Sequence, residues 1–435
     1  MSLPRYPKYK DSGVEWLGEV PGHWEVKRLK HNLHLLTEKT DRRQNPVALE
    51  NIESWTGRFI ATDTEFQGEG IAFTANDILF GKLRPYLAKA YRAESPGEAV
   101  GDFHVMRPTA GVDSRFAQYQ ILNRTFIDMV DGSTFGSKMP RASWEFVGGM
   151  PVTTPPLPEQ TQIAAFLDRE TAKIDALVAE QQRLMALLKE KRHAVISRAV
   201  TRGLNSDAPL KPSGVEWLGD VPDHWSICSI RRVVRAIEQG WSPECHSRPA
   251  DENEWGVLKA GCVNRGIYDQ QENKALPAEL VAAPEYEVRM GDVLMSRASG
   301  SPELVGSVAI VRSTRAKLML SDKIFRLRFE LHMMPDFFVA SLNSRPLRSQ
   351  IEQALSGGNG MANNLPQSSL LSFLLCVPPM AEQRAICAFL ETETASFDTL
   401  TTEAQRAITL LQERRTALIS AAVTGQIDVR GVVAA

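Results

Sequence analysis

The chain has 435 residues, of which 43% are apolar and 23% charged, a composition typical of a globular protein with two to four domains. No apolar run approaches the roughly 20 residues that a membrane helix needs, and the polar, proline-marked start does not resemble a secretory signal. We therefore expect a cytoplasmic location. The formal net charge of −2 and the sequence pI of about 6.5, taken alone, disfavour a nucleic-acid-binding protein.

Dividing the chain does not reveal a basic domain. Residues 1–155 carry 19 basic and 19 acidic side chains, and residues 204–377 carry 18 and 20. Any DNA contact must therefore come from local loops, or a partner must neutralise most of the DNA phosphates.

The cysteines do not indicate a metal site or a disulfide framework. All five lie in the second half of the chain, and none forms a Cys-x-x-Cys pair. Cys376 lies in the apolar run 373–377, which is typical of a core position. We expect neither a bound metal nor disulfides in this chain.

In chain order, the first predicted feature is a tryptophan-containing motif that returns in the second half. It reads SGVEWLGEVPGHW over Ser12–Trp24 and SGVEWLGDVPDHW over Ser213–Trp225, so 11 of 13 positions are identical. We call these segments the first and second Trp motifs. A weaker echo follows, NDILF at 76–80 and GDVLM at 291–295, and each predicts a turn followed by a buried strand. The chain is therefore an internal repeat of two halves.

The next predicted element is a long helix, also present twice. Residues 155–201 align without gaps to residues 378–424, with 26 of 47 positions identical. A pair of prolines ends whatever precedes each copy, and no proline or glycine occurs between Gln160 and Val200. Gly203 and Gly425 lie where a helix C-cap is expected. A helix of about 40 residues is roughly 60 Å long.

Apolar residues recur along both helices at alternating spacings of four and three, which predicts a coiled-coil interface. The alternative, in which each helix lies on a single globular core, is disfavoured because such a helix would extend beyond a domain only roughly 40 Å across. The predicted interface residues are Ile163, Leu167, Glu170, Ile174, Leu177, Leu184, Leu188 and Lys191 in the first helix and Ile386, Leu390, Glu393, Phe397, Leu400, Leu411, Arg414 and Leu418 in the second.

The two helices are predicted to pack antiparallel. The link from Gly203 to Ser213 is short, so the second globular region, residues 204–377, begins where the first helix ends. A parallel arrangement would require that region to span the full helix length. In an antiparallel pair Glu170 would meet Arg414, and Lys191 would meet Glu393, which would fix the register.

These elements predict a division into four segments. Residues 1–155 and 204–377 are expected to form two globular domains, while residues 156–203 and 378–435 are expected to form the long helices and the C-terminal tail.

This order resembles that of the specificity subunits of type I restriction–modification systems. The segments GVEWLGEVPGHWEVKRL and GVEWLGDVPDHWSICSI are similar to the family's motifs. So are PPLPEQTQIAAFLDRETAKIDAL and PPMAEQRAICAFLETETASFDTL, each followed by a helix that ends in VISRAVT or LISAAVT. The resemblance covers nearly the whole chain, and the combination of motifs is far more specific than any one of them.

The resemblance implies two target-recognition domains of mixed α/β structure, residues 1–155 and 204–377, that are held apart by two antiparallel helices. Each domain would read one half of a split, asymmetric site in double-stranded DNA. The helices would also dock two methyltransferase (modification) subunits, and restriction subunits could join the complex. No cofactor is expected in this chain, because S-adenosylmethionine, ATP and magnesium would be held by the partner subunits.

Loops after the predicted buried strands provide candidate DNA contacts, although each could equally be an ordinary solvated loop. Arginine can pair with guanine through two hydrogen bonds, asparagine can pair with adenine in the same way, and lysine can hold phosphate. The candidates are Lys82, Arg84, Tyr86, Lys138 and Arg141 in the first domain and Trp241, Arg297, Asn359, Asn363 and Asn364 in the second.

The sequence shows no active-site motif. The only candidates for the Asn/Asp-Pro-Pro-aromatic loop of adenine methyltransferases are residues 154–157 and 377–380, and both lack the polar first residue and the aromatic last one. Neither a dinucleotide-binding nor a phosphate-binding glycine loop is present. His23 and His224, which precede the tryptophans of the Trp motifs, are interpreted as structural.

The sequence leaves three function classes to compare. The favoured one is a non-catalytic DNA-reading scaffold. An enzyme with an unrecognised active site, a methyltransferase or nuclease, would differ from it by binding S-adenosylmethionine as the isolated chain. A pure coiled-coil interaction protein is disfavoured, because a spacer has no reason to carry two different large domains.

Overall fold

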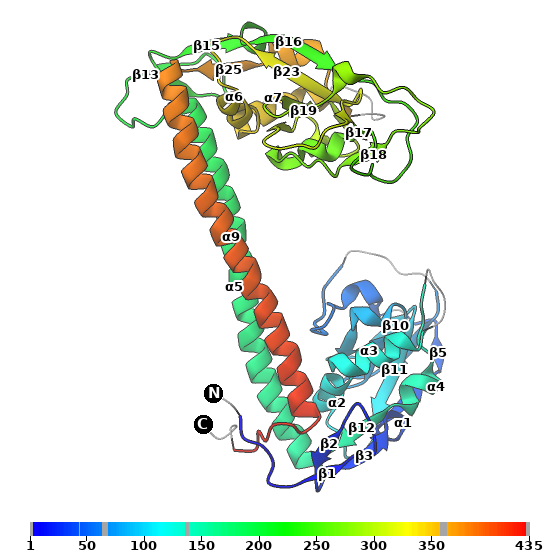
Figure 1. The fold of residues 1–435 in the computed structure, drawn as a ribbon. Coiled ribbons are helices and arrows are strands. Elements are labelled where there is room, and N and C mark those ends of the chain that lie inside the picture. Colours follow the sequence, from blue (N-terminus) through cyan, green and yellow to red (C-terminus); the bar gives the residue numbers. More distant parts are fainter. Residues whose placement is uncertain (1–2, 43, 63–67, 135–138, 357–362, 432–435) are drawn as a thin grey trace. The chain divides into compact units, whose positions relative to one another are not determined.

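The computed structural model describes residues 3–42, 44–62, 68–134, 139–356 and 363–431. The chain forms two compact units (Figure 1). Unit 1 comprises residues 1–183 and 404–435, and unit 2 comprises residues 184–403. These units do not coincide with the four predicted segments, because each unit contains one mixed α/β domain together with half of each long helix.

In its described residues, the domain of unit 1 contains short strands and four short α-helices. Helix α2 begins where the Asp113 carboxylate caps it by accepting hydrogen bonds from the backbone N–H groups of Arg115 and Phe116. The elements are β1 (Tyr9–Asp11), β2 (Glu19–Pro21), β3 (Glu25–Arg28), α1 (Leu29–Asn32), β4 (Leu33–Leu36), β5 (Lys39–Thr40), β6 (Pro46–Val47), β7 (Gly70–Phe73), β8 (Ile78–Gly81), β9 (Ala90–Arg92), β10 (Gly97–Val100), β11 (Phe103–Pro108), α2 (Ser114–Ile121), α3 (Arg124–Gly132), α4 (Trp144–Gly149) and β12 (Pro151–Thr154).

The domain of unit 2 is built from a similar succession of short strands and helices. The elements are β13 (Leu210–Pro212), β14 (Asp220–Pro222), β15 (Ser226–Ser229), β16 (Val234–Gln239), β17 (Gly256–Leu258), β18 (Asn273–Ala275), β19 (Val293–Ser296), β20 (Ala298–Ser299), β21 (Val308–Ile310), β22 (Leu318–Met319), β23 (Ile324–Phe329), α6 (Pro335–Leu342), α7 (Arg345–Ser356), β24 (Asn363–Asn364), α8 (Gln367–Ser372) and β25 (Leu374–Val377).

The main sheets of the two domains share one strand order, although the sequences of the two domains have little in common. The main sheet has the order β4-β11-β8-β9 in unit 1 and β16-β23-β19-β21 in unit 2. Strand β3 pairs with β12 just as β15 pairs with β25. The central strands β8 and β19 are buried along their whole length, as the NDILF and GDVLM patterns predicted. The internal repeat therefore extends through both domains.

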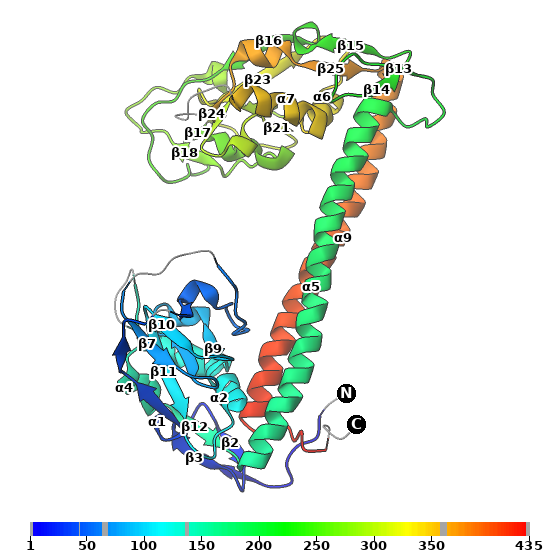
Figure 2. The same cartoon turned by 180° about the vertical axis from the view of Figure 1, so that it is seen from behind.

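The repeated segments form two long helices, α5 (Leu157–Arg202) and α9 (Met380–Val423). In unit 1, Ile163 and Leu167 near the start of α5 pack with Ala422 near the end of α9. In unit 2, Val200 near the end of α5 packs in one core with Ile386 near the start of α9. Within each unit the helices lie side by side in both views and run antiparallel, as predicted (Figures 1 and 2). Among the described residues, no helix combines the length and apolarity that a membrane crossing needs.

Each long helix ends at the predicted glycine, which contacts a tryptophan of a Trp motif. Gly203 and Gly425 have φ angles of +72° and +76°, a left-handed conformation that glycine adopts without strain. A Cβ atom on Gly203 would lie 3.0 Å from the Trp225 ring, and one on Gly425 would lie 3.0 Å from the Trp24 ring. Both indoles are fully buried. The first Trp motif therefore covers the end of α9, and the second Trp motif covers the end of α5.

The alternating spacings of four and three define two rows of predicted interface residues on each helix. The structure contradicts one of these rows. Leu177, Leu184 and Leu400 are 52%, 41% and 43% exposed, so these leucines do not lie in the interface. The less exposed residues instead occupy the next position along each helix. The alternation of four and three therefore holds in the opposite phase, through Thr171, Val178, Met185, Arg192 and Ala199 in α5 and Thr394, Thr401, Ile408, Arg415 and Ala422 in α9.

The predicted charge pairs are also wrong, because Glu170 and Lys191 belong to the displaced row. Glu170 accepts hydrogen bonds from Arg169 and Lys173 of its own helix. Lys191 lies 6.0 Å from the centre of the Phe397 ring. The ion pairs between the helices are Arg415 with Asp175, at 3.0 Å, and Arg192 with Asp398. These two pairs occupy equivalent positions in the repeat.

Removing the Arg415 guanidinium should destabilise unit 1, because this group is almost fully buried and also donates to the Trp55 carbonyl oxygen at 2.9 Å. We expect Arg415→Ala to lower the free energy of unfolding by about 2 kcal/mol. In a double-mutant cycle by urea denaturation, Arg415→Ala and Asp175→Asn should couple by more than about 0.5 kcal/mol. The same cycle on Glu170 and Arg414 is the control and should show no coupling; the opposite ranking would contradict the observed register.

Candidate nucleic-acid interface

The candidate site in unit 1 starts at the buried central strand. Lys82 directly follows β8, and both of its backbone polar groups are paired. Its N–H donates to the Asp102 carbonyl oxygen at 2.9 Å, and its carbonyl accepts from the Ala142 N–H at 2.9 Å. The loop before β11 and the segment before α4 therefore hold Lys82 from two sides.

The same segments bring the other described candidates together. Arg84 has a left-handed φ of +51°, and its N–H donates to the Pro140 carbonyl at 2.9 Å. Leu83 forms an isolated antiparallel bridge with Arg141. Tyr86 is exposed in the short 3-10 helix that follows Arg84. Lys138, the remaining candidate, lies outside the described residues.

A carboxylate connects two of these cations. Asp102 accepts hydrogen bonds from Arg141 Nε at 3.1 Å and Nη2 at 2.9 Å, and Lys82 Nζ lies 3.8 Å away. The hydrogen bond from the Arg141 guanidinium lowers the pKa of Asp102, and the charge of Lys82 acts in the same direction. The Arg141 side chain remains half exposed, so this arrangement orients a guanidinium at the surface.

Unit 2 repeats this arrangement with different side chains. Arg297 directly follows the central strand β19, as Lys82 follows β8. Its N–H donates to the Lys323 carbonyl at 2.8 Å, and its carbonyl accepts from the Leu365 N–H at 2.9 Å. Its guanidinium lies over the Phe325 ring, 5.7 Å from the centroid. Arg297 is therefore the structural equivalent of Lys82.

The other described candidates of unit 2 surround Arg297. Strand β24 holds Asn363 and Asn364 against β20, where they pair with Ser299 and Ala298. The N–H of Trp241, whose indole is exposed, donates to the Leu320 carbonyl at 3.2 Å, just before the loop that contains Lys323. The structure thus gathers four candidates at one end of the main sheet. Asn359 lies outside the described residues.

Sequence reasoning missed Asp102 and Lys323. Both directly precede the long strand that pairs with the central strand, β11 in unit 1 and β23 in unit 2, so they reach the end of the sheet from the neighbouring strand. Their only sequence signal is a charged residue immediately before an apolar strand, which is too common to single out.

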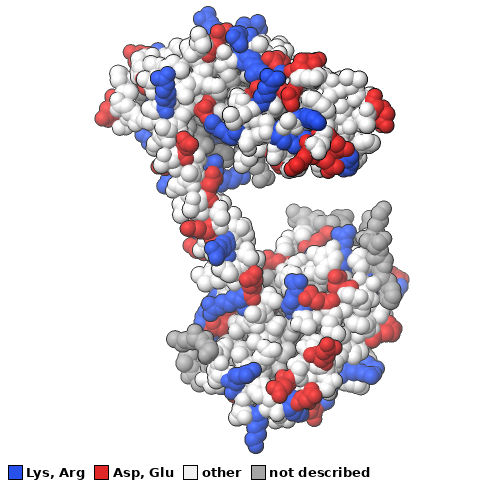
Figure 3. Space-filling view, in the orientation of Figure 1, with Lys and Arg blue, Asp and Glu red and all other residues white. Residues whose placement is uncertain are grey.

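Charges of both signs are interspersed over the face that Figure 3 shows, in agreement with the near-neutral composition. Among the described residues, no group of three or more His, Cys, Asp or Glu side chains could hold a metal ion. His23 Nε2 lies 2.8 Å from Glu159, and His224 Nε2 lies 2.6 Å from Glu382. These equivalent contacts join each Trp motif to the start of a long helix, which fits the structural interpretation of both histidines.

Known proteins resemble this chain in sequence and in fold. No protein-family model matches the chain. The chain is 34% identical to the type I restriction enzyme EcoEI specificity subunit of Escherichia coli over 212 residues, 47% of this chain and 35% of the relative. It is 24% identical to the EcoKI specificity subunit of Escherichia coli strain K12 over 337 residues, 74% of this chain and 68% of the relative. The first match thus spans about a third of the relative's length.

A solved structure on the assembly and conformational transition of the type I R-M system contains a chain with the same fold. The TM-score is 0.71 at 16% sequence identity, over 93% of this chain and 98% of that one. Two mixed α/β domains, two long antiparallel helices and the repeated Trp motifs agree with these similarities. The chain is therefore similar in sequence to the specificity subunits of type I restriction enzymes, and it shares the fold of a chain from a type I R-M system.

Proposed function

We propose that this chain is the non-catalytic DNA-recognition subunit of a type I restriction–modification complex, and that each domain reads one half of a bipartite, asymmetric DNA site. The observation that carries the proposal is the equivalence of Lys82 and Arg297. Both follow a buried central strand and are held by the same two backbone hydrogen bonds. The two domains therefore present different side chains from one backbone arrangement.

The chemistry of the two clusters suits base reading in the major groove. Unit 1 offers Arg84 and Arg141, and guanidinium groups pair with guanine through two hydrogen bonds. Unit 2 adds two neighbouring amides, Asn363 and Asn364, which can pair with adenine. Because the side chains differ between the units, the two half-sites would differ in sequence.

Affinity would come mainly from partners, since neither domain has an excess of basic residues. We infer that two methyltransferase subunits dock on this chain, one at each junction of a Trp motif with the long helices. The equivalent contacts His23–Glu159 and His224–Glu382 support two similar docking surfaces. S-adenosylmethionine, ATP and magnesium would belong to methyltransferase and restriction subunits, and the complex would act in the cytoplasm.

The test is methylation by the complex of this chain with its methyltransferase subunits. We expect Arg84→Ala to relax base preference in one half-site only, and Arg297→Ala to relax it in the other half-site only. Loss of one two-point arginine contact should reduce discrimination at one base pair by roughly tenfold to 100-fold. The measurement is sequencing of methylated sites in DNA modified by each complex.

Arg58→Ala provides the control, because Arg58 is exposed but pairs with Glu53 outside the candidate cluster. It should leave both half-sites unchanged. If Arg84→Ala and Arg297→Ala altered the same half-site, or if neither changed the methylated sequence, the assignment of one half-site to each domain would be wrong.

A further inference from the structure

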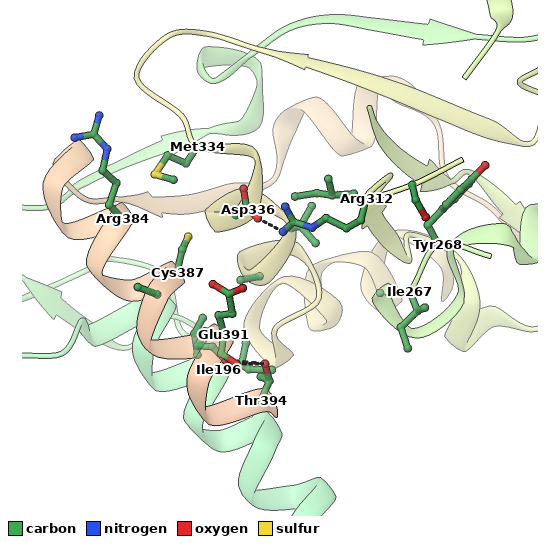
Figure 4. A pocket seen from close by; sticks show the side chains of 17 residues that line it. Ile196, Ile267, Tyr268, Arg312, Met334, Asp336, Arg384, Cys387, Glu391 and Thr394 are labelled. Atoms are coloured by element: carbon green, nitrogen blue, oxygen red, sulfur yellow. Dashed lines mark hydrogen bonds and ion pairs between the residues drawn. The ribbon is translucent and has the colours of Figure 1, made fainter. Parts of the chain in front are cut away.

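Unit 2 contains a cavity of about 900 Å³ between α6, the first turns of α9, the end of α5 and the 3-10 helix Ala260–Gly266 (Figure 4). Its wall includes Val339 and Ala340 from α6 and Leu390 from α9. Arg312 and Asp336 also line it, and they form an ion pair with each other. That pair adds no net charge to the wall.

The corresponding place in unit 1 is filled by a tyrosine. Tyr119 of α2 is only 6% exposed. Its hydroxyl donates to Asp168 Oδ1 of α5 at 2.9 Å and lies 3.2 Å from Thr171 Oγ1. Burial raises the pKa of this phenol, so the group stays protonated and acts as a hydrogen-bond donor.

Hydrogen bonds show which residues of the two units correspond. Gln160 Oε1 accepts from the Asp113 N–H at 2.9 Å, and Gln383 Oε1 accepts from the Met334 N–H at 2.8 Å. Asp113 therefore corresponds to Met334, immediately before α2 and α6. By the same spacing the buried Phe116 corresponds to the buried Phe337, and Tyr119 corresponds to Ala340.

Unit 2 keeps the polar partners of the phenol but lacks the phenol itself. In the repeat, Glu391 takes the place of Asp168, and Thr394 takes the place of Thr171. The Thr394 hydroxyl donates to the Leu390 carbonyl at 2.7 Å, as the Thr171 hydroxyl donates to the Leu167 carbonyl at 2.7 Å. Its oxygen can therefore accept a further hydrogen bond. Among the described residues, Glu391 has no ion-pair partner, and both side chains line the cavity (Figure 4).

We propose that this cavity binds the tyrosine side chain of a docked methyltransferase subunit, which supplies from outside the phenol that Tyr119 supplies in unit 1. The inference rests on the proposed function, because that function brings such a partner to the long helices. The cavity is large enough for a segment of chain around the ring, which favours a protein over a free aromatic molecule. Phe389, exposed on the same helix while its equivalent Phe166 is buried, offers further apolar surface to a partner.

Ala340→Tyr tests the proposal by filling the cavity from within. The new ring would occupy the position that Tyr119 takes in unit 1, so the midpoint of thermal unfolding should not fall. We expect Ala340→Tyr to weaken binding of the methyltransferase copy at unit 2, while the copy at unit 1, where Tyr119 already fills the corresponding place, keeps its native affinity. Native mass spectrometry at increasing partner concentrations measures both affinities. Leu331→Tyr, at a fully exposed position just before α6, is the matched control and should bind both copies with native affinity.

A second variant and a small probe cover the case in which Ala340→Tyr fails to fold. Thr394→Val removes one acceptor and should weaken binding of the second methyltransferase copy about fivefold. The probe p-cresol should bind the free native chain and be displaced by methyltransferase, measured by ligand-observed NMR. Equal p-cresol binding to the free chain and the complex would overturn the inference, as would an unchanged affinity of Ala340→Tyr for both methyltransferase copies. A native chain that binds no methyltransferase would instead contradict the proposed function.

Discussion

Replacing Trp24 or Trp225 with alanine should lower the free energy of unfolding of the unit that contains it by about 3–5 kcal/mol. Each indole is fully buried, and each packs against the left-handed glycine that ends a long helix. Truncation would open a cavity and expose the last carbonyl groups of that helix at the same time. Denaturation of the full chain, followed by circular dichroism, measures the effect.

Trp217→Ala is the matched control for this prediction. Trp217 belongs to the second Trp motif, but its side chain is exposed, so its removal should cost less than about 1 kcal/mol. If Trp225→Ala cost no more than Trp217→Ala, the helix end would not depend on the indole, and the role assigned to the Trp motif would be wrong.

The second large effect is expected from a half-length chain. Residues 1–203 retain one domain, one Trp motif and all of α5. In a homodimer of this fragment, α5 of the second copy would replace α9. Asp175 of each copy would then meet Arg192 of the other, because Arg192 and Arg415 are equivalent in the repeat. Trp24 would cover Gly203 of the second copy in place of Gly425.

Such a dimer would present two identical domains and should direct methylation to a palindromic site. Its association should be weaker than the packing within the intact chain, because the covalent link between the halves is lost. Expression of the fragment with its methyltransferase subunit, followed by sequencing of methylated DNA, provides the measurement. Methylation at the asymmetric site of the full chain, or directed by a monomeric fragment, would exclude this arrangement.

Much of the fold was predictable because the repeated segments are evident in the sequence. The long helices, their antiparallel packing and their glycine ends follow from proline placement, apolar spacing and the short link at 203–213. The sequence does not decide which positions form the second row of the interface. A spacing of four and three is kept whether that row runs through Glu170 and Leu177 or through Thr171 and Val178. Leucines at 177 and 184 favoured the wrong row. In the structure the smaller residues Thr171 and Ala199 are buried, whereas Leu177 and Leu184 are exposed.

The candidate site was less predictable than the fold. The similar five-residue segments at 76–80 and 291–295 located both central strands, and therefore the loops that follow them. The equivalence of Lys82 and Arg297 depends on backbone hydrogen bonds to residues far away in the chain, such as Ala142 and Leu365. A single sequence carries no signal for such pairings. Asp102 and Lys323 escaped notice for the same reason.

The helix ends have a consequence for how these genes can change. The contacts at Gly203 and Gly425 use the Trp motifs and the repeated helices, and both parts are nearly the same in the two halves. A domain from another gene that carries its own Trp motif and final strand would make the same contacts with the helix ends. Recombination between the repeated segments would therefore exchange whole domains, and under the proposed function each exchange would alter one half-site while the contacts at both helix ends stay unchanged.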